Sequence, residues 1–348
     1  MRAAIVGLGG IAPMHIKPLK TIGIEIVAVC DIKSENAEKV ATDLNCRAFT
    51  NYEEMLEAGG FDVLHICLPH YLHAPVSIAA LTKGFHVLTE KPMSTTIPDA
   101  EKMIDAYKKS GKALGVIFQN RYNPGVMLIK ESLDSGELGA ITGGYLRVNW
   151  HRTNAYYESA TWRATWEESG GGALIAQAIH SFDLMNYLVG NPTEVYASMA
   201  NRAHPTIEVE DVAEGVITYG SVIISFFVNT FHPYDEPASL RISCENGYVS
   251  LIGDDAEVVY NDGRKKTAGA DIEAQKLYSM KSYWGVSHVK QIADFYESIK
   301  VGETPKIDGI ESLRTQRLID AIYKSAKIGA RLDIGGFTLK LPQGDSSP

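Results

Sequence analysis

The chain has 348 residues, a length typical of two domains that each bury a full core. Hydrophobic residues make up 45% of the sequence and charged residues 22%, which indicates a folded globular protein rather than a disordered one. The formal net charge of -9 is spread without long blocks of like charge and argues against binding to DNA or RNA.

Nothing in the sequence indicates a secreted or membrane protein. The N-terminal MRAAIVGLGG leads directly into a strand and a glycine turn, which leaves no room for a signal peptide, and no apolar run reaches membrane-spanning length. The four cysteines, Cys30, Cys46, Cys67 and Cys244, are not closely paired. We therefore expect reduced thiols in a cytoplasmic protein with no nucleic-acid or membrane partner.

Short β-rich runs alternate with helical segments over residues 1–120. The β-rich runs are AAIVGLG, EIVAVCD, VLHICLP and FHVLTEKP. The helical segments between them include ENAEKVATDL, APVSIAALTKG and DAEKMIDAYKKSG. This alternation predicts an α/β fold with a parallel, doubly wound sheet, in which ligands bind beyond the carboxyl ends of the strands.

A glycine-rich turn follows the first β-rich run. Gly7-x-Gly9-x-x-Ala12 leads into a predicted helix, and Asp31 closes the second run. Glycines let the backbone approach a pyrophosphate, and free amide groups at the start of a helix attract its charge. Residues 1–120 are therefore predicted to form a dinucleotide-binding Rossmann domain.

Asp31 also bears on the choice of cofactor. A carboxylate at this position hydrogen-bonds the two ribose hydroxyls of NAD and repels the 2′-phosphate of NADP, so we expect NAD. Lys33 and Arg47 are near in the sequence and could oppose that preference.

The segment LHICLPHYLH is rich in residues that can bind metals. Its candidate ligands are His65, Cys67, His70 and His73. The first two belong to a predicted central strand, and no second cluster supplies the partners of a zinc site. We expect no metal here and interpret the segment as a loop that lines the cofactor.

Glu90-Lys91-Pro92 follows the apolar run GFHVL, which places a lysine at the end of a predicted buried strand. Burial lowers the pKa of a lysine and a neighbouring carboxylate raises it, so the charge of Lys91 would be tuned by its surroundings. A simple surface turn would also explain these three residues on their own.

After residue 120 the pattern changes to longer alternating runs and glycine turns, which predict a second domain over residues 121–341 with a mostly antiparallel sheet. The run VITYGSVIISFFV, broken at Gly220-Ser221, indicates a hairpin. Helices are expected over residues 171–190 and 310–329, and a frayed tail over 342–348. Because VIISFFVNTF is apolar on both faces, we expect a homodimer or homotetramer.

The predicted helix over residues 171–190 carries a polar stripe. Gln177, His180 and Asp183 recur at three-residue spacing among apolar residues. A buried polar stripe needs partners, and a histidine satisfied within the core is the alternative to a functional one.

Just before this helix, the segment NWHRTNAYYESATWRATW gathers aromatic residues and arginines, including Arg152, Tyr156, Tyr157 and Arg163. Such residues can stack on a sugar or nicotinamide ring and hydrogen-bond hydroxyls. They are equally typical of an oligomer interface.

These features together resemble the glucose-fructose oxidoreductase / inositol dehydrogenase (Gfo/Idh/MocA) family, and the resemblance covers nearly the whole chain. It rests on Gly7-x-Gly9-x-x-Ala12, Asp31, Glu90-Lys91-Pro92, Asn120-Arg121, TWRATW and His180-x-x-Asp183. The family resemblance implies a Rossmann domain followed by an α/β domain whose open, largely antiparallel sheet carries oligomer contacts. It also implies reversible NAD(P)-dependent oxidation of a hydroxyl on a sugar, cyclitol or related polyol.

The resemblance further implies roles for individual residues. Lys91 would orient the reacting hydroxyl, His180 would be the general base, and the peptide bond before Pro92 would be cis. The residues expected to contact the cofactor are Gly7, Gly9, Gly10, Ile11, Ala12, Asp31, Leu68, Pro69, His70, His73, Glu90, Lys91, Asn120, Trp162 and Arg163. Those expected to contact the substrate are Lys91, Arg121, Arg152, Tyr156, Gln177 and His180.

The sequence departs from the family pattern at one position. Ala176 stands four residues before His180, where many members carry a substrate-binding Asp or Asn. Whether the adjacent Gln177 takes that role, and which hydroxyls are bound, stays open.

Two other functions remain alternatives to a dehydrogenase. One is a hydrolase that uses bound NAD as a transient oxidant, which would not accumulate reduced cofactor with product. The other is a non-catalytic NAD-sensing protein, which would tolerate loss of Lys91 and His180.

Overall fold

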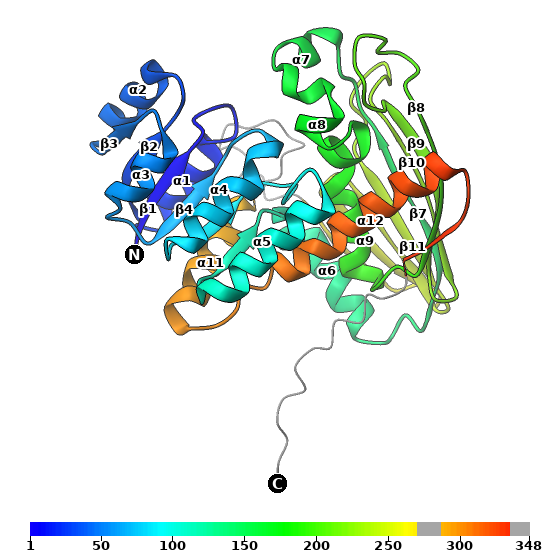
Figure 1. The fold of residues 1–348 in the computed structure, drawn as a ribbon. Coiled ribbons are helices and arrows are strands. Elements are labelled where there is room, and N and C mark those ends of the chain that lie inside the picture. The colour runs from blue at the N-terminus through cyan, green and yellow to red at the C-terminus, as the bar shows by residue number, and fades with distance from the viewer. Residues whose placement is uncertain (270–286, 335–348) are drawn as a thin grey trace.

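The structure is a computed structural model and describes residues 1–269 and 287–334 of the chain. These residues form two sheets, each flanked by helices (Figure 1). No helix in the described ranges combines the length and apolar composition needed to cross a membrane.

The first sheet has six strands in the order β3-β2-β1-β4-β5-β6, all parallel. Its strands are β1 (Arg2–Val6), β2 (Glu25–Cys30), β3 (Arg47–Phe49), β4 (Val63–Ile66), β5 (His86–Thr89) and β6 (Leu114–Val116). Its helices are α1 (Pro13–Thr21), α2 (Ser34–Leu44), α3 (Tyr52–Ala58), α4 (His70–Thr82) and α5 (Ile97–Ser110). The strand order reverses between β1 and β4, which is where a doubly wound sheet binds ligands, and the predicted fold is confirmed.

A middle segment connects the sheets and contributes short helices. It contains η1 (Gln119–Tyr122), α6 (Pro124–Asp134), β7 (Ile141–Asn149), α7 (Asn154–Glu158), η2 (Thr161–Ala164), α8 (Trp166–Ser169), η3 (Ala173–Ala178) and α9 (Ile179–Val189). The helix predicted over residues 171–190 is therefore two elements, because η3 is a π-helix and only α9 is a regular α-helix.

The second sheet has nine strands in the order β14-β13-β12-β11-β7-β10-β9-β8-β15. Besides β7, its strands are β8 (Glu194–Ala200), β9 (Val212–Tyr219), β10 (Val222–Asn229), β11 (Ser239–Cys244), β12 (Gly247–Ile252), β13 (Asp255–Tyr260), β14 (Lys265–Ala268) and β15 (Leu332–Asp333). The pair β7–β10 is parallel and the other pairs are antiparallel, with β9 and β10 forming the hairpin predicted at Gly220-Ser221.

Helices cover one face of the second sheet. Figure 1 shows α9 and α12 (Gly309–Ile328) on the side toward the first sheet. Asp308 caps α12 by accepting a hydrogen bond from the Glu311 amide, and Gly329 ends it in a left-handed conformation with φ of 64°. These two signals account for the helix predicted near residues 310–329.

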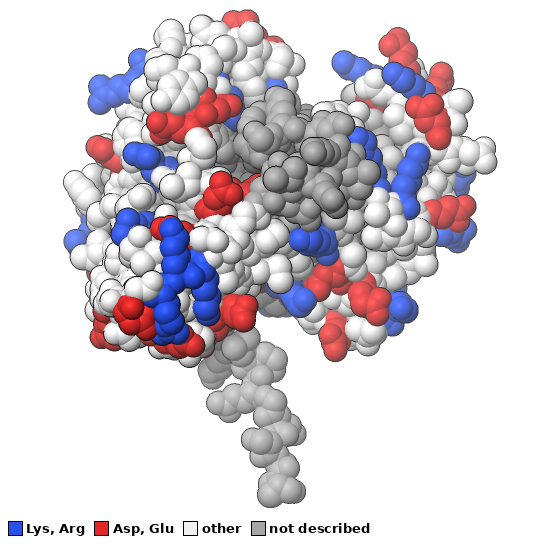
Figure 2. Space-filling view, turned by 180° about the vertical axis from the view of Figure 1, so that it is seen from behind, with Lys and Arg blue, Asp and Glu red and all other residues white. Residues whose placement is uncertain are grey.

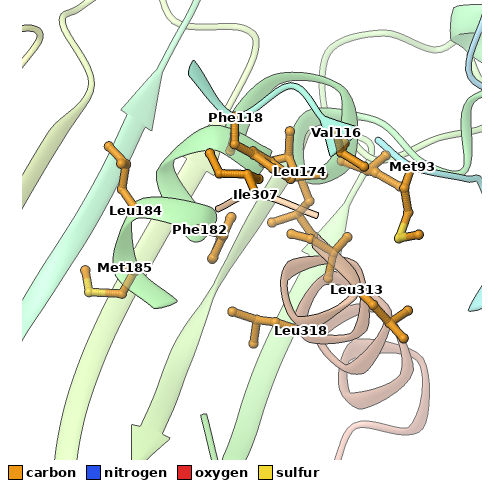
Figure 3. Packing of buried hydrophobic residues seen from close by; sticks show 14 of the residues in the cluster. Met93, Val116, Phe118, Leu174, Phe182, Leu184, Met185, Ile307, Leu313 and Leu318 are labelled. Carbon is orange, nitrogen blue, oxygen red and sulfur yellow. The ribbon is translucent and has the colours of Figure 1, made fainter. Parts of the chain in front are cut away.

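The core between the two sheets is apolar and continuous. Figure 3 shows its side chains meeting between the end of the first sheet, the η3–α9 segment and α12. The buried residues labelled there include Val116, Phe118, Leu174, Phe182, Leu313 and Leu318. Burial of this surface fixes the cofactor-binding half against the helix that carries His180.

Helix α11 (His288–Val301) returns to the first sheet late in the chain. Its Ile292 and Phe295 pack with Ala3, Ile5 and Leu88 in the core of that sheet. A segment within residues 121–341 thus completes the packing of the N-terminal half, and the domain division at residue 120 stays a prediction. The tail at residues 342–348 lies outside the described residues.

Acidic and basic side chains are interspersed over the face seen in Figure 2. Between them lie uncharged residues, and neither sign forms a continuous field over the described part of that face.

Candidate active site

A cleft of about 1140 Å³ lies at the carboxyl ends of the first sheet and is lined by residues from both halves of the chain. The predicted site residues that line it are Gly7, Gly9, Gly10, Ile11, Asp31, Leu68, Pro69, His70, His73, Glu90, Lys91, Arg152, Tyr156, Trp162, Arg163, Gln177 and His180. The fold thus brings together most of the residues expected to contact cofactor and substrate.

The glycine turn after β1 is shaped for close approach. Gly7 has φ of +85°, and a Cβ there would lie 2.5 Å from the Cys67 carbonyl oxygen, so only glycine fits. A Cβ at Gly9 or Gly10 would meet no atom within 4 Å. The backbone at these two positions is therefore open to a ligand.

Helix α1 begins beside this open space without a side-chain cap. Ala12 is its N-cap residue, Pro13 follows, and the first turn contains no acidic residue. The first amides of the helix already have acceptors, because Ala12, Met14 and His15 donate to the carbonyls of Gly9, Ile11 and Ala12. The positive end of the helix dipole still suits the negative charge of a dinucleotide pyrophosphate. Ala12 itself is buried in the core and does not line the cleft.

Asp31 lies directly after β2 at the edge of the cleft. Its carboxylate accepts hydrogen bonds from the backbone amides of Leu8 and Lys33, both at 2.9 Å, which fixes its orientation. Arg47 donates to the Ala58 and Gly59 carbonyls, outside the residues that line the cleft. The ribose end of a dinucleotide would therefore meet the carboxylate.

The histidine-rich segment after β4 is held by hydrogen bonds to carbonyl groups. His70 Nδ1 lies 2.8 Å from the Ser169 oxygen, and the two ring nitrogens of His73 lie 2.6 and 2.7 Å from the oxygens of Pro92 and Leu68. These contacts join the loop after β4 to the turn after β5. His70 and His73 lie in the first turn of α4 rather than in a loop, and both line the cleft, while their contact with a cofactor stays a prediction.

Lys91 follows the end of β5 and points its charge toward the second half of the chain. Its Nζ donates a 3.0 Å hydrogen bond to the Ala176 carbonyl in η3, and the Lys91–Pro92 peptide bond is cis. Burial lowers the pKa of the Lys91 ammonium, the Glu90 carboxylate raises it, and the charge of Arg152 lowers it further. Lys91 is thus a partly buried lysine at a strand end that contacts the second half of the chain, rather than a residue of a surface turn.

The π-helical segment η3 and the first turn of α9 each place a polar side chain in the cleft. Gln177 belongs to η3, and His180 lies in the first turn of the following α9. Burial and the Lys91 charge hold the pKa of the His180 imidazole well below its usual value, so the ring is neutral and able to accept a proton. π-helical turns often occur at functional sites because they change the direction of side chains.

Gln177 organises the side of the cleft opposite the glycine turn. Its Oε1 accepts a 3.0 Å hydrogen bond from Arg152 Nε, and its Nε2 donates to the Tyr156 hydroxyl at 2.8 Å. Arg152 also pairs with Asp235 at 2.9 Å, and Arg163 stacks over the Tyr156 ring with 4.6 Å to its centroid. Polar donors and aromatic faces here match the requirements of a hydroxyl-rich ligand.

Three predicted site residues lie elsewhere. Asn120 and Arg121 do not line the cleft. Arg121 forms buried ion pairs with Asp183 and Glu311. Ala12 packs in the core of the first sheet. The polar stripe is correspondingly divided, since Gln177 and His180 face the cleft while Asp183 is buried against Arg121. This division falls within α9, which contains both His180 and Asp183.

Sequence reasoning missed two histidines beside the cleft. His15 and His288 contact the Glu90 carboxylate, and His288 also lines the cleft. They come from α1 and α11, and no spacing in the sequence links residues so far apart.

Two family descriptions match the chain. "Oxidoreductase family, NAD-binding Rossmann fold" matches residues 1–118, and "GFO/IDH/MocA C-terminal domain" matches residues 126–250.

Curated relatives and solved structures agree with these matches. The chain is 28% identical over 248 residues to the inositol 2-dehydrogenase of Salmonella paratyphi B, covering 68% of this chain and 69% of the relative. It is 26% identical over 360 residues to the D-glucoside 3-dehydrogenase of Escherichia coli, covering 96% and 97%. The crystal structure of the WlbA dehydrogenase from Bordetella pertussis, in complex with NADH and UDP-GlcNAcA, is 30% identical with a TM-score of 0.83, covering 95% of this chain and 98% of that one.

The two family matches together cover more than half of the chain, and the strand order, glycine turn and cleft agree with them. The chain belongs to the Gfo/Idh/MocA family of NAD-binding oxidoreductases.

Proposed function

We propose that this protein is an NAD-dependent dehydrogenase that reversibly oxidises a secondary hydroxyl of a sugar, cyclitol or glycoside to a ketone. The observation that carries the proposal is the hydrogen bond from Lys91 Nζ to the Ala176 carbonyl, at 3.0 Å. This bond connects the Lys91 ammonium, in the cleft with the glycine turn, to the helical segment that directly precedes His180. A positive group and a neutral base thus share one cleft.

This pair fits the chemistry of alcohol oxidation. The hydroxyl must lose its proton as the carbonyl forms, and bound NAD supplies the acceptor for the hydride. His180 takes the hydroxyl proton, while Lys91 orients the oxygen and stabilises the negative charge that develops on it. Glu90 influences the charge of Lys91.

The cofactor is NAD rather than NADP in this proposal. Asp31 stands at the end of β2 with its carboxylate fixed by two backbone amides, and Arg47 is turned toward other carbonyls. Gly7, Gly9, Gly10 and the start of α1 would hold the pyrophosphate. His70, His73, Trp162 and Arg163 would line the remaining part of the cofactor.

The substrate would lie against Arg152, Tyr156 and Gln177. Gln177, already hydrogen-bonded to both neighbours, supplies a polar side chain next to Ala176. The relatives named above act on inositol and D-glucosides, and the Bordetella pertussis enzyme was crystallised with UDP-GlcNAcA. We infer a polyol or sugar substrate of the same broad kind.

The test is a panel of inositols, free sugars, glycosides and nucleotide sugars, each incubated with NAD while the absorbance of reduced cofactor is followed. A dehydrogenase forms reduced cofactor in proportion to ketone product. Cleavage of a glycoside without accumulation of reduced cofactor would instead support the NAD-assisted hydrolase. No turnover of any class, with tight NAD binding, would favour the NAD-sensing protein.

The proposal includes a cytoplasmic homo-oligomer of chains with the two domains assigned above. All four cysteines are unpaired, three of them fully or nearly buried, which fits a reducing compartment.

A further inference from the structure

A chain of buried polar side chains leads away from the cleft behind Lys91. Glu90 Oε1 lies 3.2 Å from His15 Nε2 and 3.5 Å from His288 Nε2. His15 Nδ1 lies 2.8 Å from His65 Nδ1, and His65 Nε2 lies 2.9 Å from the Tyr296 hydroxyl. These groups come from α1, β4, α11 and the residue after β5, so the fold brings separate elements into one chain of polar contacts.

The chemistry of these contacts fixes part of the proton arrangement. Burial raises the pKa of the Glu90 carboxyl, but the hydrogen bonds and charges of His15 and His288 outweigh it and hold the pKa well below its usual value. An ionised carboxylate only accepts, so His15 Nε2 must carry a proton and donate it. Burial also lowers the pKa of His65 well below its usual value, which makes that ring neutral.

A neutral His65 can complete the chain in two ways. If His15 carries protons on both nitrogens, it donates to His65, which then donates to Tyr296. If His15 is neutral, His65 donates to it and accepts from the Tyr296 hydroxyl. Every contact stays hydrogen-bonded in both arrangements, so the Glu90 carboxylate always has its His15 donor.

Other titratable groups near this carboxylate carry little charge. Burial lowers the pKa of His70 and His180 well below its usual value and raises that of the Cys67 thiol, so these three are neutral. Burial also lowers the pKa of His73, but the Pro92 and Leu68 carbonyls that face its two ring nitrogens raise it. On the far side of Lys91 stands the positive Arg152, which opposes the ammonium. The charge of Lys91 therefore depends strongly on Glu90.

We infer that His15 and His288 are positioning residues for Lys91: by binding one oxygen of the Glu90 carboxylate, they keep a negative charge fixed beside the Lys91 ammonium. The other oxygen, Oε2, accepts the backbone amide of Lys91 at 3.3 Å, so the carboxylate is held from both sides. This inference rests on the proposed function only for its consequence in catalysis. The link between the histidines and the charge of Lys91 stands on its own.

Without the histidines, Lys91 and Glu90 have an alternative protonation state. If the Lys91 ammonium loses a proton and the Glu90 carboxylate gains one, a neutral amine and a neutral acid remain with the same total number of protons. Burial favours this neutral pair, because it disfavours both charges. His15 and His288 oppose that transfer by stabilising the carboxylate form.

The neutral amine is the form of lysine that reacts with acylating reagents, so it can be counted directly. We would label the full-length protein briefly near neutral pH, without cofactor or substrate, and quantify Lys91 relative to the exposed Lys39 by mass spectrometry. The variants are Glu90→Gln, His15→Leu, His288→Leu and the conservative His15→Gln. His86→Gln is the matched control, since His86 lies on β5, the strand that leads to Glu90, and contacts only the Ala113 amide among the hydrogen bonds described for it.

One pKa unit corresponds to a tenfold change in the amine fraction, so we expect labelling of Lys91 to rise roughly tenfold in Glu90→Gln. It should rise at least about threefold in His15→Leu and His288→Leu, and less in His15→Gln, whose amide can still donate to the carboxylate. His86→Gln should stay within about twofold of the parent protein.

Unchanged labelling of Lys91 in folded His15→Leu and His288→Leu would overturn the inference and leave the histidines a purely structural role. If His15→Leu does not fold, His288→Leu and His15→Gln decide the question by the same measurement. In active enzyme, Glu90→Gln should also move the alkaline limb of the kcat/KM profile to lower pH, because Lys91 loses its proton earlier. Increased labelling in a protein that turns over no polyol would contradict the proposed function but not this inference.

Discussion

Arg121 donates two hydrogen bonds to the Asp183 carboxylate, 2.7 Å from Nε and 2.6 Å from Nη2. The same guanidinium reaches Glu311 at 2.9 Å, and Thr315 donates to Asp183 at 3.0 Å. This buried network joins η1, α9 and α12. Asp183 therefore anchors the helix that carries His180, and Arg121 supports the site from below rather than binding its ligand.

The first prediction concerns stability. Arg121→Ala leaves the Asp183 carboxylate buried without its main partner, so we expect the free energy of unfolding to fall by about 3–5 kcal/mol. Denaturant unfolding measures the loss. Arg264→Ala, which removes an arginine from exposed pairs with Glu137 and Asp262, should change stability little. A raised KM with unchanged stability would show that Arg121 binds substrate, as the sequence predicted.

Much of the fold was predictable because its signals are local. The alternation of strands and helices, the Gly7 turn and the position of Lys91 after a buried strand all depend on short stretches of chain. Each follows from side-chain period or backbone sterics, which act over a few residues. The hairpin at Gly220-Ser221 is a further example.

The remaining features depend on contacts between distant segments. Arg121 and Asp183 were singled out by type, but only their tertiary pairing shows that they serve each other rather than a ligand. The π-helical turn at Ala173–Ala178 depends on tertiary contacts, including the hydrogen bonds that the Gly172 and Leu174 amides donate to Glu210. The periodicity of the sequence does not reveal it. His15 and His288 meet at Glu90 only because α11 returns to the first sheet.

The second prediction concerns cofactor choice. We expect higher kcat/KM with NAD than with NADP, because the Asp31 carboxylate repels a 2′-phosphate. Asp31→Ser should lower the ratio of kcat/KM with NAD to kcat/KM with NADP by roughly tenfold or more, because the substitution removes a hydrogen bond to a charged group. Arg47→Ala should leave the ratio unchanged, since Arg47 binds the Ala58 and Gly59 carbonyls. Equal use of both cofactors by the parent enzyme would contradict the role given to Asp31.

The third prediction concerns assembly. The strand register places Tyr145, Ser225 and Tyr196 in one row across the second sheet, and both tyrosines are exposed, as is the nearby Phe227. The charged Arg147 and Glu214 flank Phe227 in the register, so aromatic and charged side chains share this face. We expect its exposed aromatic residues to be buried in a homodimer or homotetramer.

Light scattering coupled to gel filtration measures the mass of the assembly. Phe227→Glu should shift it toward the monomer, because burying an unpaired charge in an interface is costly. Met127→Glu, an equivalent change at an exposed apolar residue on α6, should leave the mass unchanged. A parent protein that is monomeric at micromolar concentration would refute the prediction.

The fourth prediction concerns pH and stability. Glu210 accepts hydrogen bonds from the Gly172 and Leu174 amides and the Tyr323 hydroxyl, but burial outweighs them and raises its pKa from 4.5 to about 7. Between these two values the folded protein binds more protons than the unfolded chain, so this group makes stability fall as pH rises.

Relative to Glu210→Gln, the parent protein should therefore lose up to about 3 kcal/mol of unfolding free energy as the pH rises across that window. Urea unfolding of both proteins at several pH values gives the difference. Glu208 is a nearby exposed carboxylate, so the unfolding free energy of Glu208→Gln should vary with pH in the same way as that of the parent protein. A constant gap between parent and Glu210→Gln would show that Glu210 is ionised throughout.

The last prediction separates cofactor binding from chemistry. Lys91→Ala and His180→Ala should leave the affinity for NAD within a few-fold of the parent, because Gly7, Gly9 and Asp31 hold the dinucleotide. Turnover should fall by roughly 10² to 10⁴-fold for His180→Ala, the usual value of general base catalysis. Lys91→Ala should lose at least as much, since both orientation and charge stabilisation disappear.

Because Lys91 and His180 act on one proton transfer, the double variant should be far less impaired than the product of the single effects. NAD affinity from fluorescence quenching and kcat from initial rates provide the two readouts. Near-normal turnover in folded His180→Ala would place the base elsewhere, with Tyr156, hydrogen-bonded to Gln177 in the cleft, as the next candidate. Near-normal turnover in Lys91→Ala would show that Glu90-Lys91-Pro92 is only a structural turn, even though its lysine is partly buried.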